Sequence, residues 1–173
     1  YLGSGQTAEV YKVRREGDKT EWALKRLIDP VYRERFFAEV ETLQRLAPRT
    51  QSESGSGSLT PKVEDTQQVG EDEFFVMTLA QGRRLDELLR EGPRFNEPDA
   101  LTILDQIAQV FDALHTHLRR DYSDFQPRNV YWDKDARRVL VIDWNLLSLE
   151  GQVNAAADVL VLGKLLYHML VGE

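Results

Sequence analysis

The sequence predicts an α+β protein in two parts. A small antiparallel sheet with one helix is expected over residues 1–80, and a mainly helical part over residues 81–173. Two observations support this fold class. Short runs with strand composition, separated by glycine-containing turns, dominate the first part. Apolar residues at three- and four-residue steps dominate the second part, whereas only one such helical pattern interrupts the strands of the first.

Composition limits the classes of function. The chain is 42% hydrophobic and 29% charged, which is typical of a soluble globular protein. Its net charge is −7 and no basic stretch stands out, so a nucleic-acid partner is not expected. The absence of cysteine excludes disulfides, a thiolate nucleophile and a cysteine-ligated metal, and fits a cytoplasmic location. The apolar run at residues 159–171 is too short to span a membrane, and Lys164 and His168 interrupt it.

The two ends suggest that this sequence is part of a larger multidomain protein. Tyr1 already lies in a strand-like segment, and Glu173 directly follows an apolar helical pattern. No signal peptide is visible at the start.

A glycine-containing loop opens the chain. Gly3 and Gly5 lie between a strand end at Leu2 and a clear strand at residues 10–13. Glycines allow the backbone to fold tightly over a ligand with its N–H groups facing phosphates, although any hairpin tip can carry two glycines. A dinucleotide-binding fingerprint would open a helix. Here the loop leads into a strand, and a second strand follows at residues 22–27.

The second strand carries Lys25 beside Ala23. A lysine within an apolar strand is usually an edge residue with its ammonium group in water. The helix expected at residues 31–46 has one apolar stripe, and two acidic residues, Glu39 and Glu41, lie close to it. Either glutamate can be a solvated helix residue or the partner of the lysine.

A connection and a hairpin follow. Residues 49–60 are rich in serine and glycine and predict a flexible connection. Residues 62–69 and 74–79 predict two strands around a turn at residues 70–72.

The second part begins with a short helix at residues 85–90. Asn96 is a good N-cap, with Pro98 in the first turn, for a helix that extends to about residue 117. His115 and His117 are expected to be structural. Side chains two residues apart on a helix face in different directions, and no further histidine or acidic cluster completes a metal site. The core side of this helix is predicted to consist of Leu101, Leu104, Ile107, Ala108, Phe111 and Leu114.

Residues 121–145 contain the polar residues with the clearest chemistry. Strands are expected at residues 130–132 and 139–142. Asp124 precedes them, Asn129 lies five positions later, and Asp143 directly follows the apolar strand. A β-hairpin has no structural need for these residues at its flanks. In phosphoryl transfer, one carboxylate orients the attacking hydroxyl, and an amide and a second carboxylate hold Mg²⁺.

Together these features resemble the protein kinase superfamily. The resemblance covers essentially all 173 residues, in the order Gly3/Gly5, Lys25, Glu39, Asp124/Asn129, Asp143 and Asp158. It implies a two-lobed kinase-like fold, with ATP and Mg²⁺ as cofactors and a protein serine/threonine hydroxyl or a small-molecule hydroxyl as acceptor. The lobe boundary is expected near residue 80.

The resemblance also implies a role for each site residue. Lys25 would hold the α- and β-phosphates, positioned by Glu39 rather than Glu41, and Asp124 would orient the acceptor hydroxyl. Asn129 and Asp143 would bind Mg²⁺. The nucleotide-binding residues would be Leu2, Gly3, Gly5, Val10, Ala23, Lys25, Met77 (the gatekeeper position), Thr78, Ala80 and Tyr131. Asp158 would bond the backbone of the catalytic loop, within a final helix over residues 156–173 that is buried on most sides.

Several positions depart from the family pattern. Tyr122 and Ser123 replace a His-Arg pair, so control through a phosphorylated activation loop is not expected. Gln126 replaces the lysine that contacts the γ-phosphate, which removes a positive charge from the transition state. Residues 143–145, Asp-Trp-Asn, stand in place of Asp-Phe-Gly; the asparagine tolerates a left-handed backbone.

Asp158 follows Asp143 by only fifteen positions, and the segment between them contains no Ala-Pro-Glu. These departures leave alternatives to a protein serine/threonine kinase. One is a pseudokinase that serves as a nucleotide-binding or scaffolding module. A second is a small-molecule kinase of the aminoglycoside phosphotransferase type, and a third is a structural domain that binds no nucleotide.

Overall fold

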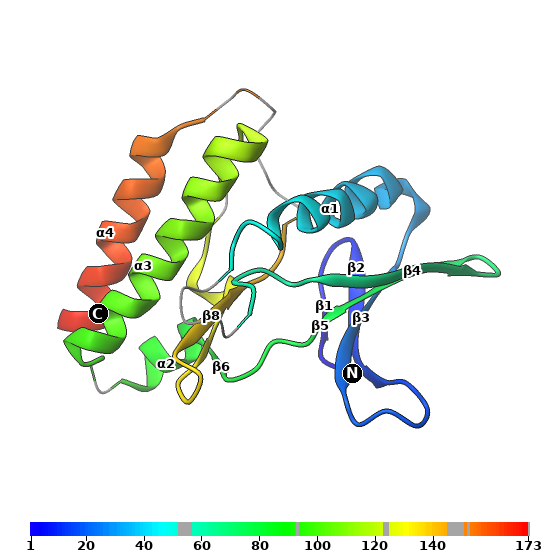
Figure 1. The fold of residues 1–173 in the computed structure, drawn as a ribbon, viewed down its shortest axis with the longest axis horizontal. Helices are drawn as coiled ribbons and strands as arrows, with labels where there is room; N and C mark the ends of the chain where they lie inside the picture. Colours follow the sequence, from blue (N-terminus) through cyan, green and yellow to red (C-terminus); the bar gives the residue numbers. More distant parts are fainter. Residues whose placement is uncertain (52–56, 93, 123–124, 145–150, 152, 173) are drawn as a thin grey trace.

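The computed structural model describes residues 1–51, 57–92, 94–122, 125–144, 151 and 153–172. Figure 1 shows an antiparallel sheet with helix α1 beside it, and a second part dominated by the helices α3 and α4. The first part contains β1 (Gly3–Ser4), β2 (Ala8–Arg14), β3 (Glu21–Leu27), α1 (Arg33–Leu46), β4 (Val63–Val69) and β5 (Asp72–Thr78). The second contains β6 (Arg83–Arg84), α2 (Leu85–Glu91), α3 (Glu97–Ala113), β7 (Val130–Asp133), β8 (Arg138–Val141) and α4 (Ala155–Val171). The α+β fold expected from the sequence is confirmed.

The first sheet places Lys25 in its centre. The strand order is β1-β2-β3-β5-β4, and all the pairings are antiparallel. Lys25 on β3 lies opposite Val10 on β2 and Phe75 on β5. Its side chain is buried, so Lys25 is not the solvated edge lysine that a single lysine in a strand usually is.

Helix α1 covers one face of this sheet. Its side chain Phe36 is fully buried and packs on Phe75 of β5, with 5.0 Å between the ring centroids. A 3-10 turn at Pro30–Tyr32, capped by the side chain of Asp29, precedes the helix. The α-helix therefore begins at Arg33, slightly later than the sequence pattern predicts.

A second sheet, with the strand order β6-β7-β8, lies in the second part of the chain. The hairpin β7–β8 pairs Val130 with Val141. Gly82, just before β6, has a φ of 82°, and a Cβ atom there would lie 2.1 Å from the carbonyl oxygen of Trp132. Any side chain at Gly82 would therefore push the chain that leaves the first sheet away from β7.

The N-cap of α3 is confirmed, but its predicted core face is partly wrong. The side chain of Asn96 accepts a hydrogen bond from the backbone N–H of Asp99 at 2.8 Å. Leu101 is 47% exposed, whereas Ala100 and Ile103 are fully buried. Leu104 and Ala108 are only partly buried. Helix α3 packs against both β8 and α4, so its buried face is set by two neighbours rather than by the single stripe read from the sequence.

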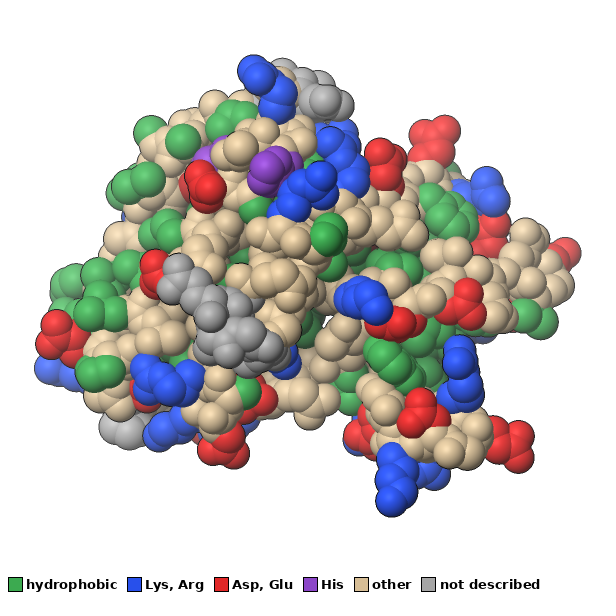
Figure 2. Space-filling view, viewed as in Figure 1, with side chains coloured by type: hydrophobic (Ala, Val, Ile, Leu, Met, Phe, Trp, Pro, Cys, Tyr) green, Lys and Arg blue, Asp and Glu red, His purple; other side chains and the backbone are tan. Residues whose placement is uncertain are grey.

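The prediction that the last helix is buried on most sides is also wrong. Its buried residues are Asp158, Leu165 and Met169, while Val159 and Leu160 are 67% and 59% exposed. Among the described elements α4 packs mainly against α3, so only one of its faces is covered. Hydrophobic side chains accordingly gather along the edge of the molecule where α4 lies (Figure 2). None of the helices in the described residues is long and apolar enough to cross a membrane.

Candidate active site

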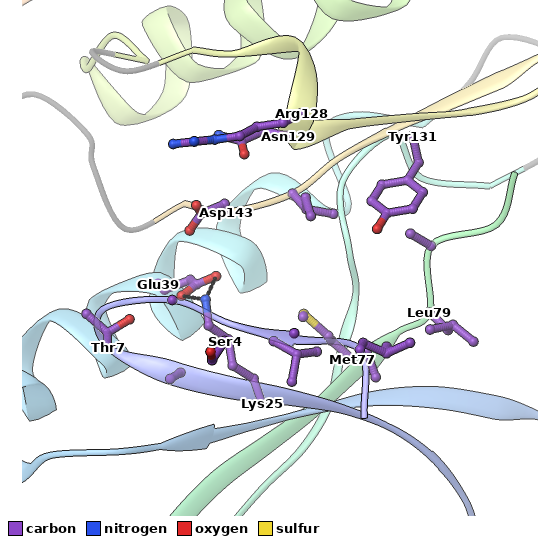
Figure 3. Close-up of a pocket in the computed structure, with 18 of the residues that line it drawn as sticks. Ser4, Thr7, Lys25, Glu39, Met77, Leu79, Arg128, Asn129, Tyr131 and Asp143 are labelled. Atoms are coloured by element: carbon purple, nitrogen blue, oxygen red, sulfur yellow. Dashed lines mark hydrogen bonds and ion pairs between the residues drawn. The ribbon is translucent and has the colours of Figure 1, made fainter. Parts of the chain in front are cut away.

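A cavity of about 460 Å³ lies between the first sheet and the hairpin β7–β8 (Figure 3). Every predicted site residue that the structure describes lines it. These residues are Leu2, Gly3, Gly5, Val10, Ala23, Lys25, Glu39, Met77, Thr78, Ala80, Asn129, Tyr131 and Asp143. Asp124, the predicted catalytic carboxylate, falls outside the described residues. The volume is within the range of small-molecule sites in proteins.

The glycine loop forms one wall of the cavity. Gly5 donates a backbone hydrogen bond to Ala8 at 2.9 Å, which closes the turn between β1 and β2. A Cβ atom at Gly3 or Gly5 would meet nothing within 4 Å, so protein packing alone does not require glycine at either position. The loop therefore leaves open space beside its backbone, as a phosphate-binding loop needs.

Lys25 and Glu39 form a buried ion pair at one end of the cavity. The Lys25 ammonium lies 2.9 Å from Oε1 and 2.6 Å from Oε2 of Glu39. The Glu39 side chain is 1% exposed and that of Lys25 is 8% exposed. Glu41, the alternative partner, points instead towards Arg45 and is 72% exposed. The pair holds the ammonium at a fixed position on the cavity wall.

A hydrogen-bond network fixes Asn129 relative to Asp143 on the opposite wall. The backbone N–H of Ile142 donates to the carbonyl oxygen of Asn129 at 2.8 Å. The Asn129 side chain donates through Nδ2 to the Tyr122 hydroxyl at 3.3 Å. That hydroxyl lies within hydrogen-bonding distance of the backbone carbonyls of Ile142 and Asp143. Because Nδ2 is used in this way, the Oδ1 atom of Asn129 is left to accept or to coordinate.

Asp143 itself has a left-handed backbone, with φ of 66°. The sequence suggested that Asn145 would tolerate such a conformation, but Asn145 lies outside the described residues. Trp144 next to Asp143 is buried, packs on Tyr122 with 5.0 Å between ring centroids, and donates from Nε1 to the carbonyl of Val141 at 3.0 Å. These contacts hold the Asp143 carboxylate at the cavity.

The other end of the cavity is more apolar. Met77 is buried, and Leu79 and Tyr131 face the cavity beside it (Figure 3). Burial raises the pKa of Tyr131 above its usual value, so its hydroxyl stays protonated at neutral pH. Among the described residues, the backbone N–H of Ala80 has no hydrogen-bond partner, which leaves it available to a ligand.

Several cavity residues were not found by sequence reasoning. They are Ser4, Gln6, Thr7, Arg35, Leu79, Arg128 and Ile142. Most lie between or next to predicted positions, so their place in the chain is the signal that could have identified them. Arg35 is different, because it is not adjacent to a predicted position in the chain. It lies one helical turn before Glu39 on α1, and both residues line the cavity.

The donor set fits a magnesium ion that is also bound by phosphates. No group of three or more His, Cys, Asp or Glu residues that could hold a metal occurs in the part of the chain that the structure describes. Asn129 and Asp143 supply two oxygen-bearing side chains on one wall. Mg²⁺ commonly uses one or two protein ligands of this kind, together with substrate phosphates and water.

Comparison with known proteins decides the family. The family model for the protein kinase domain matches residues 1–161. The chain belongs to the protein kinase domain family. The kinase-like fold expected from the motif order is thus confirmed.

Named relatives agree with this assignment. The kinase domain is 32% identical over 147 residues to serine/threonine-protein kinase PknH of Mycobacterium bovis and to that of Mycobacterium tuberculosis. The match covers 81% of this chain and 22–23% of the relatives. It is also 32% identical over 88 residues to serine/threonine-protein kinase PKH3 of Eremothecium gossypii, covering 51% of the chain and 12% of that protein. The chain therefore spans less than a quarter of the length of these relatives.

In this kinase domain, Asp158 joins α4 to the helical turn Leu114–Leu118 that follows α3 and to Tyr122, the first residue of the predicted catalytic loop at residues 122–129, so the expected contact with the backbone of that loop is present. Its carboxylate lies 2.6 Å from Nε2 of His115 and accepts a hydrogen bond from the backbone N–H of Tyr122. Burial raises the pKa of Asp158, and the hydrogen bond from His115 opposes that shift. His115 thus has a structural contact, in line with the sequence-based expectation.

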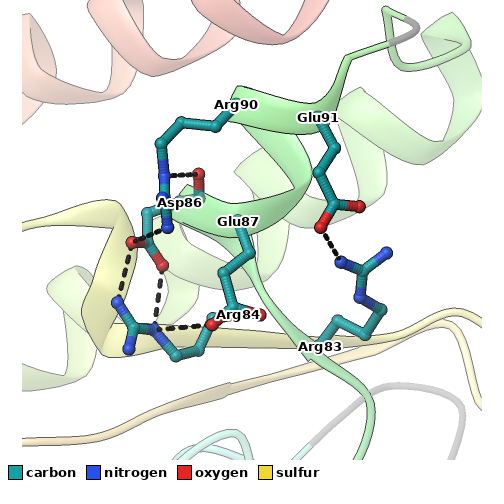
Figure 4. Close-up of polar contacts among 6 residues, drawn as sticks. All are labelled: Arg83, Arg84, Asp86, Glu87, Arg90 and Glu91. Carbon is teal, nitrogen blue, oxygen red and sulfur yellow. Dashed lines mark hydrogen bonds and ion pairs between the residues drawn. The ribbon is translucent and has the colours of Figure 1, made fainter.

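A second polar cluster lies on α2 and the end of β6, next to the turn that carries Asn129 (Figure 4). Arg84 donates to both carboxylate oxygens of Asp86, at 2.9 and 2.7 Å, and Arg90 donates to the same carboxylate at 3.3 Å. Glu87 lies 3.8 Å from Arg84. We call these four residues the α2 cluster; it is partly exposed and does not line the cavity.

Proposed function

We propose that this kinase domain transfers the γ-phosphoryl group of Mg·ATP to a serine or threonine hydroxyl of a protein. The observation that carries the proposal is the arrangement of the cavity. A buried Lys25–Glu39 pair faces Asn129 and Asp143 across a space of about 460 Å³. The relatives named serine/threonine-protein kinases support the choice of acceptor.

Each residue has a role that follows from its charge and position. Bound Mg·ATP would supply the transferable phosphoryl group and the metal that neutralises it. Lys25, held by Glu39, would bind the α- and β-phosphates at the sheet side of the cavity. Asn129, through Oδ1, and Asp143 would hold the metal on the opposite wall. The backbone N–H of Ala80 and the buried side chain of Met77 would receive the adenine at the apolar end.

The role of Asp124 is inferred from its position in the sequence. This residue lies five positions before Asn129 and falls outside the described residues. We propose that it orients the acceptor and accepts the proton that the hydroxyl loses as its oxygen bonds to the γ-phosphorus and the bond to ADP breaks.

The experiment is ADP release from Mg·ATP by the full-length protein, with and without a generic protein substrate. Asp143→Ala is expected to lower the rate by about a hundredfold or more, because it removes a metal ligand at the reacting phosphate. Asp112→Ala, an exposed carboxylate on α3 away from the cavity, is the matched control and should keep the wild-type rate. An Asp143→Ala variant with full activity would contradict the assignment.

A nucleotide-binding pseudokinase is the second candidate, and Gln126 is the observation that favours it. Gln126 stands where the family pattern has a lysine, so one positive charge near the γ-phosphate is missing. Thermal stabilisation by Mg·ATP without any ADP release would support this candidate. A phosphorylated small molecule as the product would instead indicate the aminoglycoside phosphotransferase type.

A further inference from the structure

A second ion pair joins α1 to the first sheet, at the start of the helix and outside the cavity. Nε of Arg33, the first residue of α1, lies 2.7 Å from Oε1 and 2.9 Å from Oε2 of Glu73 on β5. The Glu73 side chain is 9% exposed, whereas that of Arg33 is 58% exposed. Neither residue lines the cavity, so any effect of this pair on a bound nucleotide has to pass through other residues.

The carboxylate of Glu73 is a fixed point on the sheet. Glu73 alternates along β5 with Phe75 and Met77, which are buried on the same face, and β5 itself lies between β3 and β4. A carboxylate in such a position is costly to leave unpaired, because burial removes the water that would solvate it. Arg33 supplies the opposite charge, and its guanidinium carbon lies 5.1 Å from the centroid of the Phe37 ring. The pair therefore holds the first turn of α1 at one place on the sheet.

The contacts of α1 with the sheet lead step by step from Arg33 to Glu39. Phe36 lies three residues after Arg33 and three before Glu39, so each is a neighbour of the next on the helix surface. The Phe36 ring packs on Phe75, which lies opposite Lys25 in the register of β3 and β5. The ion pair of Arg33, the aromatic contact and the ion pair of Glu39 thus follow one another along α1. A rotation of the helix that breaks the first would also move the last.

The far end of α1 is held by contacts of another kind. Leu43 and Leu46 are fully buried there, and Nη2 of Arg45 donates to the backbone carbonyl of His117 at 3.1 Å. Figure 1 shows this end of α1 towards the second part of the chain. Burial of apolar side chains is non-directional, so it keeps the last turns on the core without fixing the rotation of the helix. The directional contact that fixes the rotation is the ion pair at the first turn.

We propose that Arg33 is a positioning residue for phosphoryl transfer. Its ion pair with Glu73 fixes the rotation of α1, and α1 in turn holds the Glu39 carboxylate against the Lys25 ammonium. This inference rests on the proposed function, because the position of that ammonium matters only if it binds nucleotide phosphates. A small displacement of a group that orients a substrate lowers the rate strongly even when the fold is kept.

The test is a double-mutant cycle on the full-length protein, with kcat/KM for Mg·ATP measured by ADP release. Arg33→Gln is expected to lower kcat/KM by about tenfold, and Arg33→Lys should recover most of the loss because it keeps the charge. Glu73→Gln breaks the ion pair without leaving a buried charge, and should give the same loss in a protein that folds. In a Glu39→Gln background, Arg33→Gln should cost less than about twofold more, because the group through which it acts is already changed. The affinity for Mg·ADP, measured by calorimetry, gives the same cycle for variants with slow turnover.

Arg83→Gln is the matched control, because it removes an arginine that pairs with the carboxylate of Glu91 at 2.6 Å, on β6 and α2 rather than α1. It should keep the wild-type kcat/KM. Wild-type kcat/KM in Arg33→Gln would overturn the inference and leave the proposed function intact. Equal fold-losses from Arg33→Gln with and without the Glu39 substitution would also overturn it, because they would show that the pair contributes only to the general structure. A wild-type protein that neither binds nor turns over Mg·ATP would overturn the proposed function together with this inference.

Discussion

Two groups of ionic contacts in this molecule have similar distances and very different surroundings. Lys25 and Glu39 meet at 2.6 Å, with side chains that are 8% and 1% exposed. Arg84 and Asp86 of the α2 cluster meet at 2.7 Å, with side chains that are 36% and 25% exposed. Both are well-formed ion pairs by geometry. Only the first has lost nearly all of its contact with water.

The difference teaches that distance alone does not indicate what an ion pair contributes. Removing two charges from water costs several kcal/mol per ion, roughly the size of their mutual attraction, so a buried pair adds little net stability. Removing one partner, however, leaves a buried charge without compensation. In the α2 cluster, water and neighbouring charges can replace a lost partner. The buried pair therefore holds an ammonium in place at the cavity, whereas the exposed cluster adds small increments to stability.

The largest expected effect comes from breaking the buried pair. Lys25→Met leaves the Glu39 carboxylate buried without its partner, and should lower the free energy of unfolding by about 3–5 kcal/mol. ATP turnover should be lost as well, because no ammonium remains to bind the phosphates. Urea unfolding and ADP release measure the two effects. A loss in unfolding free energy comparable to that of an exposed pair would remove the contrast between the two sites.

A double variant sharpens the same prediction. Lys25→Met combined with Glu39→Leu removes both charges and fills the site with apolar side chains, so it should recover most of the lost stability. Turnover should stay absent, because the apolar pair cannot bind phosphate. Recovery of turnover in the double variant would contradict the proposed role of Lys25.

A smaller effect is expected in the α2 cluster. A double-mutant cycle with Arg84→Ala and Asp86→Ala should give a coupling free energy of about 0.2–1 kcal/mol, which is the range for exposed ion pairs. Salt should weaken this coupling, whereas the coupling between Lys25 and Glu39 should change little, because buried charges are screened much less. Urea unfolding of the four proteins at low and high salt measures both. A salt-independent coupling of several kcal/mol would show that the α2 cluster behaves as a buried pair.

The smallest effect concerns pH. Burial raises the pKa of Asp86, but the hydrogen bond and charge of Arg84, together with Arg90, outweigh burial and hold the pKa below its ordinary value of 3.8. The stability contributed by ionised Asp86 is therefore present above that ordinary value and is lost as the pH falls through the lowered pKa. The difference in unfolding free energy between wild type and Asp86→Asn should shrink between about pH 5 and about pH 2. A difference that grows on acidification would mean that the pKa is raised instead.

Much of the candidate site could be predicted from the sequence because its signals are local. Gly3 and Gly5 precede a strand, Lys25 lies in an apolar strand, and Asp143 follows another, so short patterns place them. The choice of Glu39 over Glu41 followed from the resemblance to the kinase helix, and the structure pairs Glu39 with Lys25. Arg35 and Arg128 were missed, because whether a charged side chain faces a cavity depends on how distant segments pack.

The two 17-residue helices show most clearly what the sequence by itself determined and what only the tertiary structure decided. Helix α3 could be predicted from its N-cap and its apolar periodicity, and α4 from its apolar run and its resemblance to the kinase pattern, since these signals involve only near neighbours in the chain. The tertiary structure decided which faces are buried. Ile103 lies in the core between α3 and its two neighbours, whereas the equally apolar Leu160 is exposed, because among the described elements α4 packs mainly against α3. Burial depends on the partners that surround a residue, and those partners come from distant parts of the chain.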